Sequence, residues 1–174
     1  MALAACLLFD RQTERTLRAL WDRLEDLGVP TLRSHTHGRH VPHVSYAVVR
    51  DGDVEAIHRS VAALPDGGAV GLRFDALGLF RRGRSWLVPA VAHDLVSRQE
   101  RVVAAVMSTG AELHRHYEPG AWMPHCTIAP RVPLPILPVL AAAVYEVLPL
   151  AARADWAALV DSGTGEIWPL PHIP

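Results

Sequence analysis

The sequence predicts an α+β fold in which mostly antiparallel strands alternate with amphipathic helices. Short apolar runs and segments of helical period alternate along all 174 residues, and no Gly-rich phosphate loop of a doubly wound nucleotide-binding fold follows a strand. Two similar segments also lie about half a chain apart, which indicates an internal duplication. We therefore expect residues 1–174 to form a single bilobal, pseudo-twofold domain. In it, two mostly antiparallel sheets face a central cleft and the helices lie outside.

The first half of the chain predicts two strands and two helices. Ala2 to Phe9 is apolar throughout and is typical of a buried strand. Asp10 can then cap a helix that ends at Gly28, because Leu17, Leu20, Trp21, Leu24 and Leu27 share one face. The other elements expected here are a polar loop at 31–42, a strand at 43–49, a short helix at 53–64 and a loop at 65–68.

The second half predicts two hairpins separated by helices and a further strand. The expected elements are a hairpin of 70–80 with 85–91, a helix at 93–109, a loop at 111–124, a strand at 125–129, a helix at 134–148 and a hairpin of 154–160 with 166–170. Pro138 lies deeper in the helix at 134–148 than a first-turn proline should.

The two similar segments both contain proline, histidine, any residue and a hydroxyl residue. They place His43 before Ser45 and His125 before Thr127, with the two histidines 82 residues apart. A proline before the histidine lowers the number of matches expected by chance to about 0.06, so two copies are a specific signal. A third His-x-Ser, at His58, lacks the proline and falls in a predicted helix, where positions two apart do not share a face.

These four residues suit phosphodiester cleavage. In a strand, residues i and i+2 point to the same side, so each histidine projects with its hydroxyl partner. One neutral imidazole can take a proton from the attacking oxygen, while one imidazolium protonates the departing oxygen. The hydroxyls of Ser45 and Thr127 can donate hydrogen bonds to the non-bridging phosphate oxygens. The residues do not decide which histidine, His43 or His125, acts as base.

Two His-x-Ser/Thr strands half a chain apart resemble the 2H phosphoesterase superfamily, which includes 2′-5′ RNA ligase-like proteins and cyclic phosphodiesterases. Residues 74–80 (FDALGLF) look like the family's strand before its central hairpin, and 117–130 (YEPGAWMPHCTIAP) look like its second-motif region. The resemblance implies a bilobal fold with the site between the lobes. It also implies metal-independent hydrolysis or transesterification of a 2′,3′-cyclic phosphate or a 2′-5′ linkage, with His43, Ser45, His125 and Thr127 as catalytic residues.

Five further residues are candidates for substrate binding because they lie near the motifs or on the arginine-rich turn at 81–84. They are Tyr117, Trp122, Arg131, Arg82 and His40. Aromatic rings can stack on a base, and the planar guanidinium matches phosphate.

Composition limits the other possibilities. Seventeen basic residues, all arginine, and eighteen acidic residues give a net charge of −1. This near-balance argues against binding to long duplex nucleic acid. The absence of lysine excludes Schiff-base chemistry. Two unpaired cysteines and no stretch of about 20 apolar residues favour a cytoplasmic protein without a membrane span. We expect a monomer that acts on a small nucleotide or RNA terminus and uses no cofactor.

Two alternatives remain open. The histidines of the loop at 35–43 have His-x-His spacing and could bind a metal ion. Alternatively, the chain could be a nucleotide- or RNA-binding module that has the fold without turnover.

Overall fold

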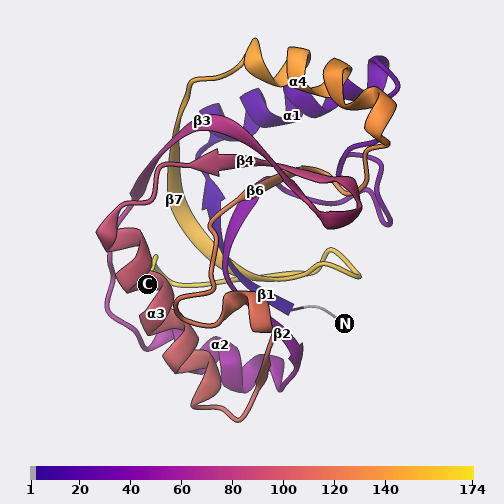
Figure 1. Cartoon of the computed structure of the whole chain (residues 1–174). Helices are drawn as coiled ribbons and strands as arrows, with labels where there is room; N and C mark the ends of the chain where they lie inside the picture. Colours follow the sequence, from indigo (N-terminus) through magenta and orange to yellow (C-terminus); the bar gives the residue numbers. More distant parts are fainter. Residues whose placement is uncertain (1–2) are drawn as a thin grey trace.

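A twelve-residue strand, β7 (Leu150–Asp161), joins the two halves of the molecule in the computed structural model, which describes residues 3–174 (Figure 1). One edge of β7 pairs with β1 (Leu3–Phe9). Its other neighbours are β3 (Val70–Phe80), along residues 150–154, and β8 (Ile167–Pro169), along residues 158–160. Because β7 belongs to both halves, the strands form one sheet rather than the two separate sheets that the sequence predicted.

The remaining strands extend this sheet on both sides. They are β2 (His43–Asp51) and β5 (Glu112–Leu113) next to β1, and β4 (Arg84–Pro89) and β6 (Cys126–Ala129) next to β3. Every strand pair within residues 3–174 is antiparallel. The predicted α+β class is confirmed.

Four α-helices cover one face of the sheet in two pairs. The helices α1 (Arg11–Asp26) and α4 (Leu137–Tyr145) lie over one half, and α2 (Val54–Ala62) and α3 (His93–Met107) lie over the other (Figure 1). The main hydrophobic core lies beneath these helices. None of the helices within residues 3–174 has both the length and the apolarity needed to cross a bilayer.

The β1 strand shows how the two faces of the sheet differ. Leu3, Ala5, Leu7 and Phe9 belong to the main core, whereas the residues between them belong to a smaller cluster on the opposite face: Ala4, Cys6 and Leu8. This is the period of two expected of a strand. The motif residues lie on the same face as the smaller cluster.

The first two helices begin where the sequence predicts. The Asp10 carboxylate accepts a hydrogen bond from the Thr13 N–H at 2.7 Å, and Asp53 accepts one from the Ala56 N–H at 2.8 Å. Each aspartate satisfies one of the N–H groups that a helix leaves free at its first turn.

Three predicted segments differ from the structure. The helix expected at 134–148 divides into a 3-10 turn (Leu134–Ile136) and α4, which places Pro138 in the first turn of α4, where proline is tolerated. The strand expected at 154–160 begins earlier, at Leu150. Its first half alternates buried and exposed side chains, and the exposed ones interrupt the apolar run from which the strand is expected. The loop expected at 111–124 contains β5 and a 3-10 turn (Arg115–Tyr117). With only two residues, β5 is too short to show the alternating pattern by which a strand is predicted.

Candidate active site

The two Pro-His segments share one local geometry. The Nδ1 atom of His43 lies 2.7 Å from the carbonyl oxygen of Val41, and the Nδ1 atom of His125 lies 2.7 Å from the carbonyl oxygen of Met123. A carbonyl oxygen only accepts, so Nδ1 carries the proton in each ring. Each neutral imidazole therefore has its lone pair on Nε2, which leaves this atom to accept a proton.

The strands aim both motifs away from the helices. On β2, Val44 and Tyr46 pack in the main core, so His43 and Ser45 point to the opposite face. On β6, Cys126 and Ile128 are core residues. The intervening Thr127 pairs with Trp86, which lies outside that core.

Contacts between β2 and β6 bring the two motifs together, although neither strand pairs with the other in the sheet. The backbone of His43 lies close enough to the thiol of Cys126, the residue that follows the second histidine, to affect the pKa of that thiol. The charge of His43 also contributes to lowering the pKa of His125. The structure thus places the two motif segments, which come from opposite halves of the chain, next to each other.

The hydroxyl of Ser45 belongs to a small buried network. Its Oγ lies 3.5 Å from the Sγ of Cys6 on the neighbouring strand, and the side chain also lies close enough to the Tyr117 phenol to affect the pKa of that group. Burial raises the pKa of Tyr117 to about 12, so the phenol stays protonated. The first motif therefore has a neutral phenol O–H group beside its serine. Sequence reasoning missed Cys6, because only strand pairing places it opposite Ser45.

Two aromatic rings surround the imidazole of His125. Its centroid lies 5.1 Å from that of Phe80 and 5.5 Å from that of Trp86, both in edge-on arrangements. The rings of Phe80 and Trp86 stack on each other with centroids 4.7 Å apart. Gly78 allows this packing, because a Cβ there would come within 2.5 Å of the Trp86 ring. The glycine in the 74–80 segment is the sequence signal for this close contact.

Burial lowers the pKa of both motif histidines. For His125 the pKa falls to about 4, mainly by desolvation and further through the charges of His43 and Arg84, while its bond to Met123 opposes the shift. For His43 desolvation also lowers the pKa, and the bond to Val41 opposes this. Burial disfavours the imidazolium form, so both rings are neutral near neutral pH before an anionic substrate arrives.

The predicted substrate-binding residues fall into two groups. Tyr117 contacts Ser45, and the Trp122 Nε1–H donates to the carbonyl oxygen of Ser45 at 3.0 Å. In contrast, Arg82 and Arg131 are exposed beside the β3–β4 hairpin turn. No hydrogen bond or ion pair joins either arginine to a motif residue within 3–174. Arg84 is the arginine whose charge acts on His125.

The histidine-rich loop before β2 packs on itself and on the β7–β8 turn. The ring of His40 lies 4.2 Å from that of His37 and 5.8 Å from that of His35, and its Nε2 bonds to Thr36 at 2.9 Å. Desolvation and the neighbouring histidines, including His43, lower the pKa of His40 to about 4. No group of three or more His, Cys, Asp or Glu residues within 3–174 is arranged to hold a metal ion. The geometry therefore gives no support to the metal-binding alternative.

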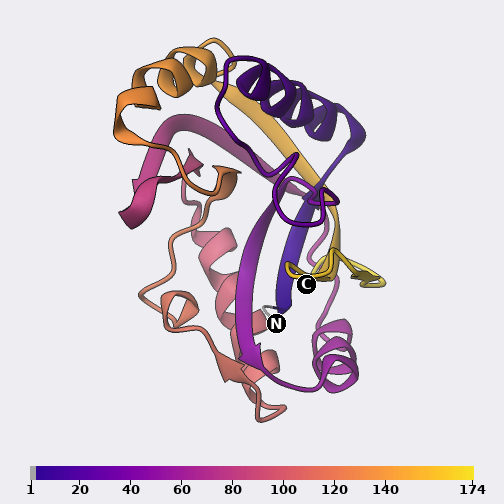
Figure 2. The same cartoon turned by 90° about the vertical axis from the view of Figure 1, so that its right-hand side faces the viewer.

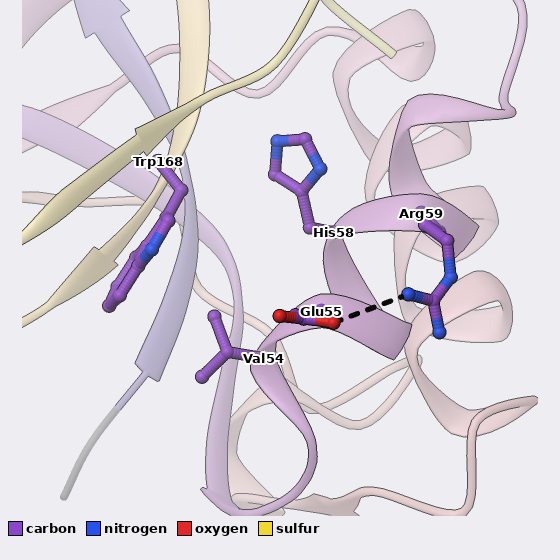
Figure 3. Close-up of a pocket in the computed structure, with 5 residues that line it drawn as sticks. All are labelled: Val54, Glu55, His58, Arg59 and Trp168. Atoms are coloured by element: carbon purple, nitrogen blue, oxygen red, sulfur yellow. Dashed lines mark ion pairs between the residues drawn. The ribbon is translucent and has the colours of Figure 1, made fainter.

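The third His-x-Ser motif has a structural role. His58 Nε2 donates to the Pro169 carbonyl oxygen at 2.8 Å, whereas the Ser60 hydroxyl donates to the Ala105 carbonyl oxygen at 2.8 Å on α3. His58 lines a pocket of about 310 Å³ between α2 and β8, together with Trp168 and the Glu55–Arg59 ion pair (Figure 3). The two side chains have separate partners and do not converge, as the helical placement predicted.

Comparison with known proteins agrees with this geometry. A sequence model described as the 2′-5′ RNA ligase superfamily matches residues 13–166. The chain belongs to this superfamily. Membership confirms the resemblance to 2H phosphoesterases and indicates a phosphodiesterase- or ligase-type enzyme acting on RNA ends. No curated protein matches the chain.

Solved structures share the fold at low sequence identity. A crystal structure of a phosphoesterase has a TM-score of 0.58 and 15% identity, with 97% of this chain and 94% of that chain covered. The MHV ns2 PDE domain has a TM-score of 0.57 and 14% identity, covering 97% and 95%. E. coli LigT, complexed with NADP+, has a TM-score of 0.56 and 13% identity, covering 97% and 93%. These similarities show that this chain has the same fold as the three solved structures.

Proposed function

We propose that this superfamily member is a metal-independent phosphodiesterase that cleaves a 2′,3′-cyclic phosphate or a 2′-5′ phosphodiester in a small nucleotide or RNA end. The matched pair of imidazoles supports this proposal most strongly. Both His43 and His125 donate from Nδ1 to the carbonyl oxygen two residues earlier, at 2.7 Å in each case. Two rings held in the same tautomer, on strands that meet, suit a reaction that needs one base and one acid.

The proposed hydrolysis has a balanced proton inventory. The Nε2 atom of one imidazole takes a proton from water while the water oxygen bonds to phosphorus. The P–O bond to the departing ribose oxygen breaks, and the second ring, which enters as imidazolium, protonates that oxygen. The products are a phosphomonoester and a free hydroxyl, and the two rings exchange protons with solvent to restore their starting states.

Hydroxyl groups supply the electrostatic part of the proposal. Thr127 and Ser45 share the motif face and can donate to the non-bridging oxygens, where negative charge increases in the transition state. The Tyr117 phenol, which contacts Ser45, is a third donor. Arg84 lies near enough for its charge to act on His125. Because the sequence contains no lysine, positive charge beside the phosphate has to come from arginine or imidazolium, and Arg84 supplies it.

The proposal includes a monomeric protein in a reducing, cytoplasmic compartment. Supporting the compartment, Cys6 and Cys126 are both buried free thiols, and burial raises the pKa of each to about 12. Such thiols are protonated and poor nucleophiles. This also supports a catalytic role for His125 rather than for the adjacent cysteine.

A substrate panel in EDTA tests the proposed function. The purified protein is incubated with 2′,3′-cyclic mononucleotides and with 2′-5′-linked dinucleotides, and the position of the phosphate in each product is determined. We expect turnover of at least one class at the same rate with and without the chelator. Activity that EDTA abolishes would contradict the metal-independent mechanism, and binding without turnover would support the alternative of a nucleotide-binding module.

A further inference from the structure

The chain between β5 and β6 runs back along the outer edge of β2, from the far end of that strand to the first motif (Figure 2). The His114 N–H donates to the carbonyl oxygen of Val48 at 2.8 Å. The side chain of Gln99, on α3, donates to the carbonyl oxygens of both Tyr46 on β2 and Tyr117, at 3.2 and 2.8 Å. These bonds hold residues 114–117 beside the strand that carries His43 and Ser45.

Three rings on this segment form a row that leads away from the first motif. The Tyr117 hydroxyl contacts Ser45, and the Tyr117 ring lies 6.2 Å from that of His114 at 78°. The His114 ring lies 5.1 Å from that of His116 at 37°. Tyr117 and His114 are half-buried, while His116 is exposed. We call Tyr117, His114 and His116 the ring row.

Positive charge accompanies the ring row. Arg84 shares the face of β4 that carries Trp86, because positions two apart on a strand point the same way. Together with desolvation, the charges of Arg50, His116, Arg115 and Arg84 lower the pKa of His114. Among residues 3–174, Arg84 and Arg115 form no ion pair.

Two carboxylates lie on the same segment and offset part of this charge. Glu112 pairs with Arg50 at 3.3 Å, so this arginine already has an anionic partner. Glu118 is exposed and follows Tyr117 directly. The unpaired Arg84 and Arg115 remain the cations available to a bound anion.

We propose that the ring row, Arg84 and Arg115 form a subsite for the penultimate nucleotide of an RNA 3′ end, the one on the 5′ side of the nucleotide that carries the scissile phosphate. The base stacks on the imidazoles of His114 and His116, and its phosphate binds the two arginines. This inference rests on the proposed function, since it places the reacting phosphate between His43 and His125. It adds that an oligonucleotide binds better than a mononucleotide.

The chemistry of the subsite supports this ligand. Unpaired bases stack on aromatic and imidazole faces, and the guanidinium fork matches two phosphate oxygens. A phosphate beside His114 would also favour its imidazolium form, since a nearby opposite charge raises a histidine pKa. The formal net charge of −1 over the whole chain supports contacts with one or two nucleotides near the site rather than with a long polymer.

A binding experiment tests the subsite without requiring turnover. The affinities of a 3′-phosphorylated trinucleotide and of the matching 3′-phosphorylated mononucleotide are measured by titration calorimetry. We expect the wild-type protein to bind the trinucleotide about 10-fold or more tightly, the effect of one stacked base with a phosphate contact. Raising the salt concentration should reduce this preference, because the phosphate contacts are electrostatic.

Variants at exposed positions keep the test independent of folding. His116→Ala and Arg115→Gln should each reduce the trinucleotide preference several-fold, and the double variant should remove most of it. His93→Ala and Arg15→Gln are matched controls, because both residues lie outside the ring row, on α3 and α1. Equal affinity for the two ligands in the wild-type protein, or an unchanged preference in the double variant, would overturn the subsite.

A turnover measurement separates this inference from the proposed function. The ratio of kcat/KM for a trinucleotide ending in a 2′,3′-cyclic phosphate to that for a cyclic mononucleotide should be about 10 in the wild-type protein and fall in the double variant. A ratio near one, with both substrates cleaved, would overturn the proposed subsite and leave the proposed function intact. Cleavage of neither substrate contradicts the proposed function, and the calorimetric comparison then decides the subsite by itself.

Discussion

The two motif histidines have the same backbone partner but different surroundings. Each Nδ1 donates to the carbonyl oxygen two residues earlier, so the tautomer is common to both. His43 lies beside a hydroxyl network of Ser45 and Tyr117, whereas the ring of His125 packs against Phe80 and Trp86. The comparison shows that the local motif determines which nitrogen can react, while distant residues determine the polarity around it.

Removing either imidazole should have the largest effect. His43→Ala and His125→Ala are each expected to lower kcat by about 10² to 10⁴-fold, because each removes one proton-transfer group. His58→Ala, which removes the histidine of the third His-x-Ser motif, is the control and should retain the wild-type rate. Steady-state kinetics on a cyclic nucleotide measure all three. A wild-type rate in either motif variant would contradict the two-histidine mechanism.

The hydroxyls should show the asymmetry between the motifs. Thr127→Ala should lower kcat by about 10²-fold or more, as expected for the loss of a transition-state donor. Ser45→Ala should cost less, because the Tyr117 hydroxyl remains beside it. Adding Tyr117→Phe to Ser45→Ala should bring the loss up to that of Thr127→Ala. Equal losses in the two single variants would show that the phenol does not compensate.

The pH dependence should reflect the lowered pKa values of both rings. The reaction needs one neutral ring and one imidazolium, and both rings are neutral near neutral pH. As pH falls, protonation of one ring raises kcat/KM until protonation of the second ring removes the base. We therefore expect a bell-shaped profile with its maximum below pH 6.5, the usual histidine pKa. A maximum on the alkaline side would contradict this environment for the histidines.

The smallest effect concerns only the aromatic surroundings of His125. Gly78→Ala would place a Cβ within 2.5 Å of the Trp86 ring and displace it, which we expect to lower kcat several-fold and the free energy of unfolding by about 1–3 kcal/mol. Gly71→Ala, on the same strand, is the control, because its Cβ would meet no atom within 4 Å. Kinetics and chemical denaturation measure both variants. Identical behaviour of the two would show that Trp86 does not position His125.

Much of the fold could be predicted because its signals are local. The Asp10 cap and the apolar face of α1 depend on residues within a few positions of each other. The full length of β7 could not be predicted from an apolar run. Its first half exposes Arg153 and Asp155, and only pairing with β1 and β3 shows that these residues continue the strand.

The substrate-binding candidates show the same limit. Tyr117 and Trp122 were predicted from their closeness to His125 along the chain, yet both contact Ser45 of the other motif. The sequence favours Arg82, on the hairpin turn, as a phosphate contact, but its backbone adopts a left-handed conformation there with φ of 70°, and its side chain is exposed. Arg84, on the motif face of β4, acts on His125 instead. Sequence distance alone does not identify which arginine faces the site.

The sequence by itself determined the two Pro-His motifs, their hydroxyl partners and the face they share, because strand alternation and a bond to the carbonyl two residues earlier are properties of a few consecutive residues. Only the tertiary structure decided that Cys6 and Tyr117 meet Ser45, and that Phe80 and Trp86 enclose His125. These contacts arise from strand pairing and packing between positions distant in the chain. No local pattern encodes them, and they decide how polar each imidazole's environment is.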